Sequence, residues 1–494
     1  MSFQTILIAN RGEIACRVIR TARDMGYGTV AVYTAPDAGA PHVAMADQAV
    51  LLAERTDGTE PYLSIDAVLD AARKSGADAI HPGYGFLSEN AAFSEACDQA
   101  GITFIGPEAS SIRLMGDKAA GKRAMQDAGV PCVPGYQGDD QSLERLTTEA
   151  EKLGTPILIK AVAGGGGRGM RRVDDLADFA DALASARSEA LNAFGSNDVI
   201  LERALDRVRH VEVQVFADTH GNVVHLGERD CSSQRRNQKV IEEAPSPAVD
   251  AALRQKLGEA ACRVKAIGYR GAGTMEFLMT PDRDFYFIEM NTRLQVEHPV
   301  TEEITGLDLV EWQLRIAAGE TLPLSQGEIS LAGASIEARL YAEDPAESFM
   351  PQNGTIGEFD WQDADGVRLD YGVVPGYQLT PRYDPMIAKV ITTGSDRAEA
   401  LRKLVKTLEG LRLTGLTTNK SFLLACARDP EFVSGDFDTG FIDRLLHGVD
   451  PDLGVGVDQE PGEVGDLAAV TKHGDQFLGT EIGRAAHVGA EAEQ

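Results

Sequence analysis

The chain has 494 residues, of which 43% are hydrophobic and 25% are charged. These proportions are typical of globular proteins and exclude collagen-like, mucin-like and wholly disordered chains. At roughly 150 residues per domain, the length predicts about three domains. The 47 basic and 76 acidic side chains give a formal net charge of -29, which argues against nucleic acid and anionic membrane surfaces as partners.

The spacing of the cysteines and the composition of the N-terminus bear on the cellular compartment of the protein. Six cysteines are scattered without a C-x-x-C pair, so the sequence predicts neither a zinc cage nor a redox dithiol. The segment Met1–Asn10 lacks the basic and apolar regions of a signal peptide, and no stretch reaches the roughly 18 apolar residues of a membrane span. We therefore expect a cytoplasmic protein that does not enter a membrane.

The first part of the chain alternates between strand and helix patterns. Strands are predicted at 5–9, 29–33, 79–80 and 103–105, with helices after Gly12 and over 64–75. This alternation predicts a parallel sheet with helices on both faces, whose ligands bind at the carboxyl ends of the strands. Because no G-x-G-x-x-G motif is present in this first part of the chain, a dinucleotide is not predicted there.

The pattern changes beyond about residue 114. A helix (118–128) and a Pro/Gly turn (131–135) precede strands at 156–159, 211–217, 223–228, 273–279 and 285–290, which predicts an α+β central domain. A third block has strands at 336–341 and 386–392 and helices at 397–409 and 421–427, and we expect it to pack against the middle domain. The acidic segment after Gly448 is predicted to be a flexible, solvated tail.

A glycine run, Gly164–Gly169, follows the predicted strand that ends in Lys160. Backbone N–H groups without side chains around them can surround phosphate oxygens, and a lysine at a strand end can neutralise their charge. A flexible turn explains the glycines alone equally well. Lys160 favours phosphate binding.

Polar residues alternate along and beyond the strand at 285–290. They are Glu289, Asn291, Arg293, Gln295 and Glu297, which share one face if the strand continues. Glu276 lies between apolar neighbours on another predicted strand. Carboxylates with an amide oxygen are hard ligands suited to Mg²⁺, and the absence of His and Cys among them argues against zinc. The alternative is a solvated strand face.

Other candidates are weaker alone. The His81–Gly85 segment is typical of a structural turn, and His210 at a strand start is more often structural than catalytic. The basic segment Arg235–Lys239 can hold an anion or face solvent. Arg339 lies in an apolar strand, where an unpaired charge is costly, so we expect a carboxylate or an anionic substrate near it.

Five motifs carry a resemblance to a known family. They are ANRGEIA (9–15), HPGYGFLSEN (81–90), MGDK (115–118), GGGGRGM (164–170) and EMNTRLQVEHPVTE (289–302). In this order, from about Ile6 to Leu446, the chain resembles the biotin carboxylase family of the ATP-grasp superfamily. The resemblance implies an N-terminal parallel-sheet domain (1–114), an ATP-grasp domain (115–333) with a mobile lid at about 131–204, a C-terminal α+β domain (334–446) and a tail (447–494).

The resemblance also implies roles for individual residues. ATP would be bound by Lys118, Lys160, Gly166, Gly167, Glu202, His210 and Gln234. Mg²⁺ or Mn²⁺ would be held by Glu276, Glu289 and Asn291. Bicarbonate would be held by Lys239, Arg293, Gln295 and Val296, with Glu297 as its base, and Tyr84 and Arg339 would face biotin. Asn237 stands where many members have His, and it would contact the nucleotide in its place because its amide can still donate and accept hydrogen bonds.

The implied activity is the first half-reaction of an acyl-CoA carboxylase. Bicarbonate attacks the γ-phosphate of ATP to give carboxyphosphate, and CO₂ released from it is captured by biotin beside Arg339. The alternative is another ATP-grasp ligase that joins a carboxylate to an amine, but such a ligase should lack the RLQVEHP and HPGYGF stretches found here. An inactive paralogue would be favoured by loss of Lys160, Glu289 or Glu297, and all three are present.

The resemblance further implies partners: a biotin carboxyl carrier protein, a carboxyltransferase subunit and a second copy of the chain in a homodimer. No methionine follows Met386, so the Met-Lys-Met of a carrier domain is missing, and we expect biotin to arrive in trans. The segment Tyr383–Lys389 resembles the propionyl-CoA and methylcrotonyl-CoA carboxylase branch. The acyl-CoA itself is not predicted, because the carboxyltransferase selects it.

Overall fold

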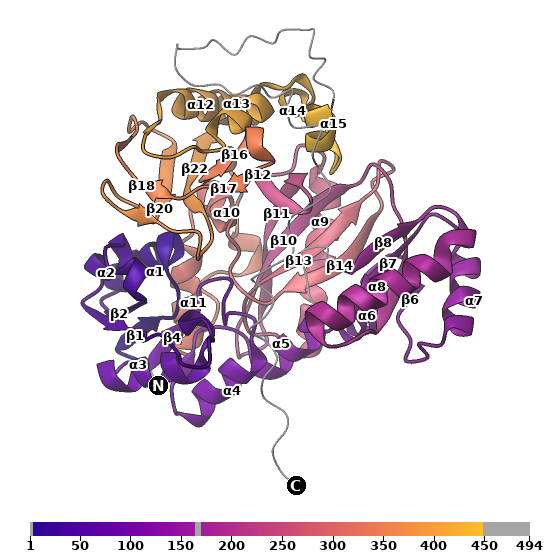
Figure 1. Cartoon of the computed structure of the whole chain (residues 1–494), viewed down its shortest axis with the longest axis horizontal. Helices are drawn as coiled ribbons and strands as arrows, with labels where there is room; N and C mark the ends of the chain where they lie inside the picture. The colour runs from indigo at the N-terminus through magenta and orange to yellow at the C-terminus, as the bar shows by residue number, and fades with distance from the viewer. Residues whose placement is uncertain (1–2, 164–168, 448–494) are drawn as a thin grey trace.

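The computed structural model describes residues 3–163 and 169–447, and Figure 1 shows their arrangement. Gly166, Gly167 and the acidic tail beyond His447 lie outside the described residues. Within the described ranges, no helix is both long and apolar enough to cross a membrane.

The N-terminal unit, at the lower left of Figure 1, is built on a parallel sheet. In spatial order its strands are β3 (Gln48–Leu51), β2 (Gly28–Tyr33), β1 (Thr5–Ile8), β4 (Ala79–His81) and β5 (Thr103–Phe104). The helices that cover it include α1 (Gly12–Asp24), α3 (Ile65–Ser75) and α4 (Ala91–Gln99). Ile6 and Ile8 pack against α1, whereas Leu7, between them, packs against α3 and α4. The predicted sheet with helices on both faces is confirmed.

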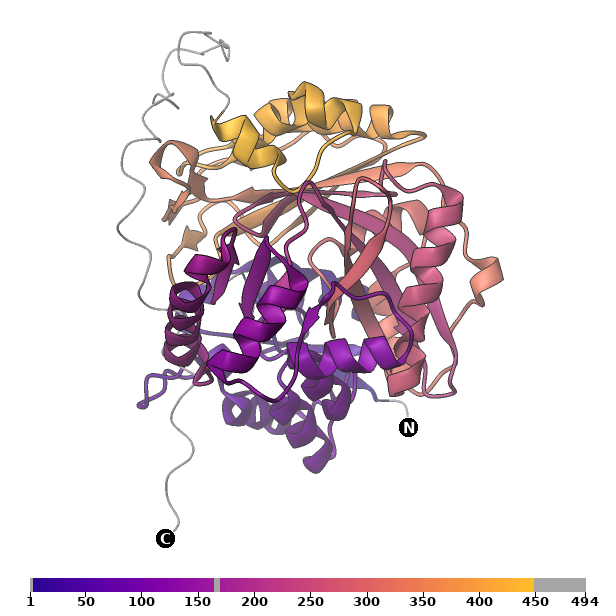
Figure 2. The ribbon, with the colours of Figure 1, turned by 90° about the vertical axis from the view of Figure 1, so that its right-hand side faces the viewer.

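A small sheet with its own apolar core projects at the right of Figure 1, and Figure 2 views the molecule from that side. In spatial order its strands are β6 (Gly135–Tyr136), β9 (Val199–Arg203), β7 (Ile157–Ala161) and β8 (Met170–Val173). Helices α7 (Leu143–Leu153) and α8 (Phe179–Phe194) pack on it through Leu146 and Leu183. This unit occupies the segment for which the sequence predicts a lid, and its movement stays a prediction.

An eight-stranded antiparallel sheet joins the central and C-terminal parts of the chain. In spatial order its strands are β14 (Phe285–Asn291), β13 (Gly271–Met279), β10 (Arg209–Ala217), β11 (Val223–Arg235), β12 (Gln238–Ala244), β15 (Ala334–Tyr341), β22 (Met386–Gly394) and β20 (Val367–Tyr371). Ile241 of β12 pairs with Ala338 of β15, so the sheet runs across the boundary predicted at 333/334. The third block therefore extends the central sheet as well as packing against it.

The remaining elements cover these sheets or connect them. The helices are α2 (Pro41–Met45), α5 (Ala109–Gly116), α6 (Lys118–Asp127), α9 (Ala251–Ala261), α10 (His298–Thr305), α11 (Leu309–Ala317), α12 (Arg397–Gly410), α13 (Lys420–Arg428), α14 (Pro430–Ser434) and α15 (Phe441–His447). The short strands are β16 (Glu343–Asp344), β17 (Met350–Pro351), β18 (Gly354–Thr355), β19 (Phe359–Asp360), β21 (Gln378–Leu379) and β23 (Arg412–Leu413). Leu404 and Leu408 of α12 lie in the C-terminal core with Val390 of β22.

The strand through Glu289 is shorter than the alternating pattern suggests. β14 ends at Asn291, and α10 begins at His298 with Pro299 in its first turn. Proline fixes the backbone angle that a helix start needs, and a strand continued to Glu297 would leave no room for the chain to turn into that helix. The expectation of one strand face from Glu289 to Glu297 is therefore wrong beyond Asn291.

Candidate active site

One face of the eight-stranded sheet carries charged residues where α10 covers it. Val211 and Val213 of β10 lie in the apolar core with α9, so Glu212, between them, points to the opposite face. The same alternation on β13 turns Glu276 to that face. Both carboxylates are buried, so each needs a charged or hydrogen-bonding partner.

Lys239 of β12 supplies the shared partner. Its Nζ lies 2.6 Å from Glu212 Oε2, 3.1 Å from Glu276 Oε1 and 2.6 Å from Glu297 Oε1. Burial disfavours its charge, yet the surrounding anions raise the pKa of Lys239 well above its usual value. The lysine therefore stays cationic at the point where strands β10, β12 and β13 and the start of α10 meet.

Arg339 of β15 lies on the other side of Glu297. Its Nε donates to Glu242 Oε1 at 2.6 Å and its Nη2 donates to Glu297 Oε2 at 2.9 Å. The expectation that a carboxylate lies near this arginine is confirmed. Burial opposes ionisation of Glu297, but Lys239 and Arg339 outweigh it and hold its pKa well below the usual range.

Glu276 and Glu289 lie directly opposite each other on β13 and β14. Like charges at such positions repel, and burial together with Glu276 raises the pKa of Glu289. Asn291 donates from Nδ2 to Glu276 Oε1 at 2.7 Å, so its amide lies at the same place. Two opposed carboxylates and an amide favour a bound cation, and these hard oxygen ligands fit Mg²⁺ or Mn²⁺.

His210, Glu212 and Glu276 form a second group whose ligand atoms lie within 4.8 Å of one another. Lys239 Nζ already contacts one oxygen of each carboxylate, Glu212 Oε2 and Glu276 Oε1. His210 Nε2 instead lies 2.9 Å from Glu276 Oε2, which makes it a hydrogen-bonding neighbour of the proposed metal ligand.

The small sheet brings two lysines to one carboxylate. Glu202 of β9 is buried and lies 2.5 Å from Lys160 Nζ of β7 and 2.7 Å from Lys122 Nζ of α6. Burial opposes its ionisation, but these two cations hold the pKa of Glu202 below its usual value. Lys160 and Glu202 are thus brought together as the resemblance implies, and Lys118 at the start of α6 is close enough to affect the pKa of Glu289.

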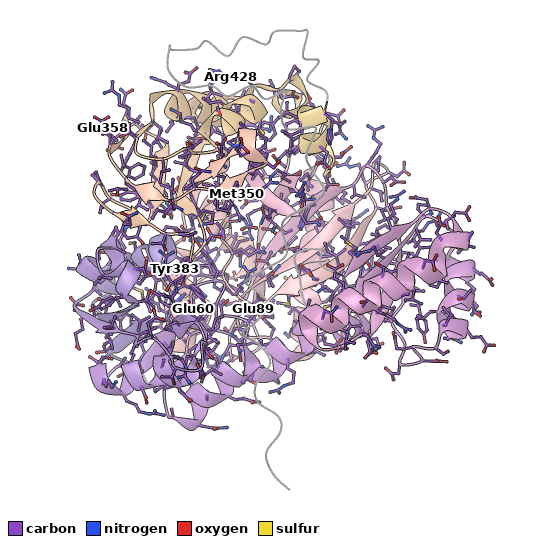
Figure 3. The ribbon with its side chains drawn as sticks, in the orientation of Figure 1. Glu60, Glu89, Met350, Glu358, Tyr383 and Arg428 are labelled. Atoms are coloured by element: carbon purple, nitrogen blue, oxygen red, sulfur yellow. The ribbon has the colours of Figure 1, made fainter. Side chains whose placement is uncertain are left out.

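The segment between β14 and α10 carries the predicted bicarbonate residues. Arg293 donates from Nε to Glu89 Oε2 at 2.7 Å and from Nη2 to Asn291 Oδ1 at 3.0 Å; Glu89 is labelled in Figure 3. Gln295 donates from Nε2 to Glu276 Oε1 at 3.0 Å. The backbone carbonyl of Val296 accepts a hydrogen bond from Lys389. The structure therefore places Gln295 and Glu297 in the cluster around Lys239, whereas Arg293 contacts Glu89 and Asn291.

The other three predicted residues are Tyr84, Asn237 and Gln234, which pairs with Lys239 across β11 and β12. Tyr84 donates from its hydroxyl to Glu13 Oε1 and is half-buried, and Gln234 is half-buried near the end of β11. Asn237 is exposed in the tight turn between β11 and β12, where its φ of 65° is left-handed. Asparagine adopts this conformation more readily than most residues. A nucleotide contact by Asn237 stays a prediction.

Sequence reasoning missed several members of the site. Arg229 is completely buried; its Nε donates to Glu212 Oε1 at 2.6 Å and its Nη2 donates to Gln295 Oε1 at 3.1 Å. Glu212 and Glu242 were also missed. The available indication was charge in otherwise apolar strands, as in R-H-V-E-V-Q-V-F-A, where buried charge requires partners.

Comparisons with known proteins agree with this geometry. A biotin carboxylase N-terminal domain model matches residues 2–112, a carbamoyl-phosphate synthase L chain ATP-binding domain model matches 117–325, and a biotin carboxylase C-terminal domain model matches 337–444. A biotin carboxylase of Halalkalibacterium halodurans is 50% identical over 445 residues, covering 90% of this chain and 98% of that protein. The methylcrotonoyl-CoA carboxylase alpha subunit of Mus musculus is 54% identical over 443 residues, 89% of this chain.

Two solved structures are also similar. A biotin carboxylase complex with beta-gamma-ATP from Campylobacter jejuni has a TM-score of 0.87 at 44% identity, covering 90% of this chain and 99% of that one. The biotin carboxylase domain dimer of Hydrogenobacter thermophilus 2-oxoglutarate carboxylase, with MgADP, ADP and bicarbonate, has a TM-score of 0.87 at 45% identity, covering 91% and 99%.

The fold is that of the ATP-grasp class, and its central domain matches an ATP-binding domain model. Within that class the chain belongs to the biotin carboxylase family, which confirms the resemblance carried by the sequence motifs. The chain spans 62% of the length of the mouse methylcrotonoyl-CoA carboxylase alpha subunit and 63% of the Dictyostelium discoideum one.

Proposed function

We propose that this chain carboxylates carrier-linked biotin, using ATP and bicarbonate. The observation that carries the proposal is the placement of Glu297 between two cations, Lys239 and Arg339, beside the opposed carboxylates Glu276 and Glu289. Buried cations next to a pair of opposed carboxylates that can hold a divalent cation suit the transfer of a phosphoryl group to a small anion.

The residues around Lys160 hold the nucleotide in this proposal. Lys160 and Lys118, with Gly166 and Gly167, neutralise and surround its phosphates, while Glu202 orients Lys160. His210 and Gln234 complete the binding site. Mg²⁺ or Mn²⁺ held by Glu276, Glu289 and Asn291 supplies positive charge at the transferred phosphoryl group when bound.

Bicarbonate lies against Lys239, Arg293, Gln295 and Val296. Glu297 accepts its proton as a bicarbonate oxygen attacks the γ-phosphorus, giving carboxyphosphate and ADP. The depressed pKa of Glu297 keeps this base ionised, and entry of a second anion beside it raises that pKa toward the value a base needs.

Biotin accepts the carboxyl group near Tyr84 and Arg339. Carboxyphosphate breaks down to CO₂ and phosphate, phosphate takes the ureido proton of biotin, and Arg339 stabilises the resulting anion while CO₂ adds to it. Arg339 suits this role because its guanidinium is fixed by Glu242 and Glu297 before biotin arrives.

We further propose that biotin arrives on a biotin carboxyl carrier protein, that a carboxyltransferase subunit uses the carboxybiotin, and that the chain forms a homodimer. The mouse and Dictyostelium relatives support a methylcrotonoyl-CoA-type final acceptor, in agreement with the 383–389 segment. The dimeric domain from Hydrogenobacter thermophilus supports the homodimer. A cytoplasmic location stays a prediction, since both of these carboxylase subunits are named as mitochondrial.

The test is an assay of bicarbonate-dependent ATP hydrolysis with and without free biotin. Stimulation by biotin supports the proposal. Stimulation only by an amine would instead support a carboxylate–amine ligase. The carrier proposal is tested by adding a purified biotinylated carrier protein, which should be carboxylated in the presence of ATP and bicarbonate.

A further inference from the structure

A buried ion pair outside the catalytic cluster connects the three parts of the chain. Lys389 of β22 is completely buried, and its Nζ lies 3.2 Å from Glu13 Oε1 of α1 and 3.9 Å from Asp370 Oδ2 of β20. A buried pair is costly to assemble and contributes little stability compared with apolar packing, so stability alone does not explain its placement.

The two members of the ion pair are hydrogen-bonded to residues assigned to two different substrates, bicarbonate and biotin. Lys389 Nζ donates to the backbone carbonyl of Val296 at 2.9 Å. Glu13 Oε1 accepts a hydrogen bond from the hydroxyl of Tyr84. The path Tyr84–Glu13–Lys389–Val296 therefore joins the residue placed against biotin to the segment placed against bicarbonate.

The contact at Val296 bears directly on the catalytic base. Its carbonyl belongs to the peptide that continues into Glu297, and Glu297 is the residue that precedes the first turn of α10. A donor fixed on that carbonyl sets the orientation of the peptide and hence the direction in which the Glu297 side chain leaves the backbone. Lys389 is not itself among the residues assigned to a substrate, so its effect passes through Val296 and Glu297.

The backbone at Glu13 packs closely against the segment that follows β20. A side chain at Gly372, just after β20, would overlap the backbone of Gly12 and Glu13, so only glycine allows this approach. Glu13 Oε2 is buried and, among the described residues, has no hydrogen-bond partner. Glu13 thus contacts both Tyr84 and Lys389 through the same oxygen, Oε1.

We propose that Lys389, held by Glu13, is a positioning residue that fixes the Val296–Glu297 peptide for bicarbonate activation. This inference rests on the proposed function. It assigns a role to a lysine of the C-terminal strands, so that the bicarbonate site is complete only when α1, β22 and the start of α10 are assembled.

The test begins with Lys389→Met, which keeps the unbranched stem of the side chain and removes the donor. Initial rates of ATP hydrolysis are measured while bicarbonate and MgATP are varied separately in the presence of biotin. We expect the KM for bicarbonate to rise, or kcat to fall, by about tenfold or more, because small displacements of a reacting group are costly. The KM for MgATP should change by less than about twofold, since Lys160 and Glu202 lie on the separate small sheet.

Lys403→Met is the matched control. Lys403 Nζ donates to the carbonyl of Thr393 at 2.8 Å and lies 3.2 Å from Glu399 Oε1, so it also combines a backbone carbonyl with a glutamate. It lies on α12, away from the cluster around Lys239. This variant should keep the kinetic constants of the unmodified chain.

A double variant separates positioning from stability. Glu13→Gln with Lys389→Met removes both charges of the pair while leaving an acceptor oxygen for Tyr84. Its melting temperature should recover toward that of the unmodified chain relative to Lys389→Met alone, because no charge of the pair is then left uncompensated. Its bicarbonate kinetics should stay impaired, because the donor to Val296 is still missing.

If Lys389→Met does not fold, the double variant supplies the kinetic measurement. Near-normal bicarbonate kinetics in either variant, while the unmodified chain is active, would overturn the positioning role and leave the proposed function intact. Recovery of both stability and kinetics in the double variant would also overturn it, since the pair would then be structural only. An unmodified chain without bicarbonate-dependent activity would overturn the proposed function and the inference with it.

Discussion

Replacing Glu297 by Gln separates the chemistry of the site from its assembly. The change keeps the size of the side chain and removes the proton acceptor. Loss of a positioned general base typically costs about 10²–10⁴-fold in rate, so we expect bicarbonate-dependent turnover to fall by at least about a hundredfold. Nucleotide affinity should be nearly unchanged, because Lys160 and Glu202 make no hydrogen bond or ion pair with Glu297 among the described contacts.

The contacts around Glu297 also set the cost in stability. Lys239 keeps Glu212 and Glu276 when the charge at 297 is removed, and Arg339 keeps Glu242. Each cation therefore keeps a carboxylate partner. The loss in free energy of unfolding should be about 1–3 kcal/mol, below the 3–5 kcal/mol of a fully broken buried pair. A melting curve and a urea titration measure it.

The assay follows phosphate release at saturating MgATP while bicarbonate is varied, with nucleotide affinity measured by calorimetry. Glu303→Gln is the matched control, because Glu303 lies on α10, which begins just after Glu297, but contacts Arg368 and Thr393 instead of the lysine cluster. Turnover close to that of the unmodified chain in Glu297→Gln would refute the assignment of the base. A loss of nucleotide affinity in this variant would show that Glu297 also contributes to nucleotide binding.

Three further outcomes are expected. Lys160→Ala should weaken ATP binding by about tenfold or more, since a charge-assisted phosphate contact is lost, and unchanged affinity in calorimetry would contradict its role. Glu289→Gln should raise the Mg²⁺ concentration needed for half-maximal activity, whereas an unchanged requirement would remove it from the metal site. Burial raises the pKa of Glu243 from 4.5 to about 7 despite Arg397, so its contribution to stability is present below 4.5 and lost as the pH rises through about 7. Glu243→Gln should therefore flatten this part of the pH dependence of the free energy of unfolding, and urea titrations showing an identical slope in both chains would contradict the pKa.

The N-terminal sheet could be predicted because its physics is local. Each strand is a short apolar run followed by a helix pattern, and the alternation of Ile6, Leu7 and Ile8 between two faces follows from strand geometry. The family motifs could be found for a similar reason, since they are contiguous in sequence.

The central charged cluster could not be predicted in the same way. Glu212 and Arg229 meet because β10 and β11 pair, and Lys239 joins them from β12, so the ion pairs depend on register and not on spacing along the chain. The error beyond Asn291 has the same origin. Alternating polarity suggested a continuing strand, whereas Pro299 and the start of α10 turned the chain.

The continuous sheet explains why Arg339 can act on a site built mainly by the central strands. Ile241 of β12 pairs with Ala338 of β15, which places Arg339 next to Glu242 and within reach of Glu297. Backbone pairing holds such neighbours more firmly than a loop contact between separate domains could, and a transition-state charge is stabilised best by groups that do not have to move. The same argument applies to Lys389, which backbone pairing holds opposite Arg339 across β15 and β22. The C-terminal strands thus complete the site as members of its sheet, and a chain ending before β22 should lack bicarbonate activation even if its nucleotide-binding unit folds.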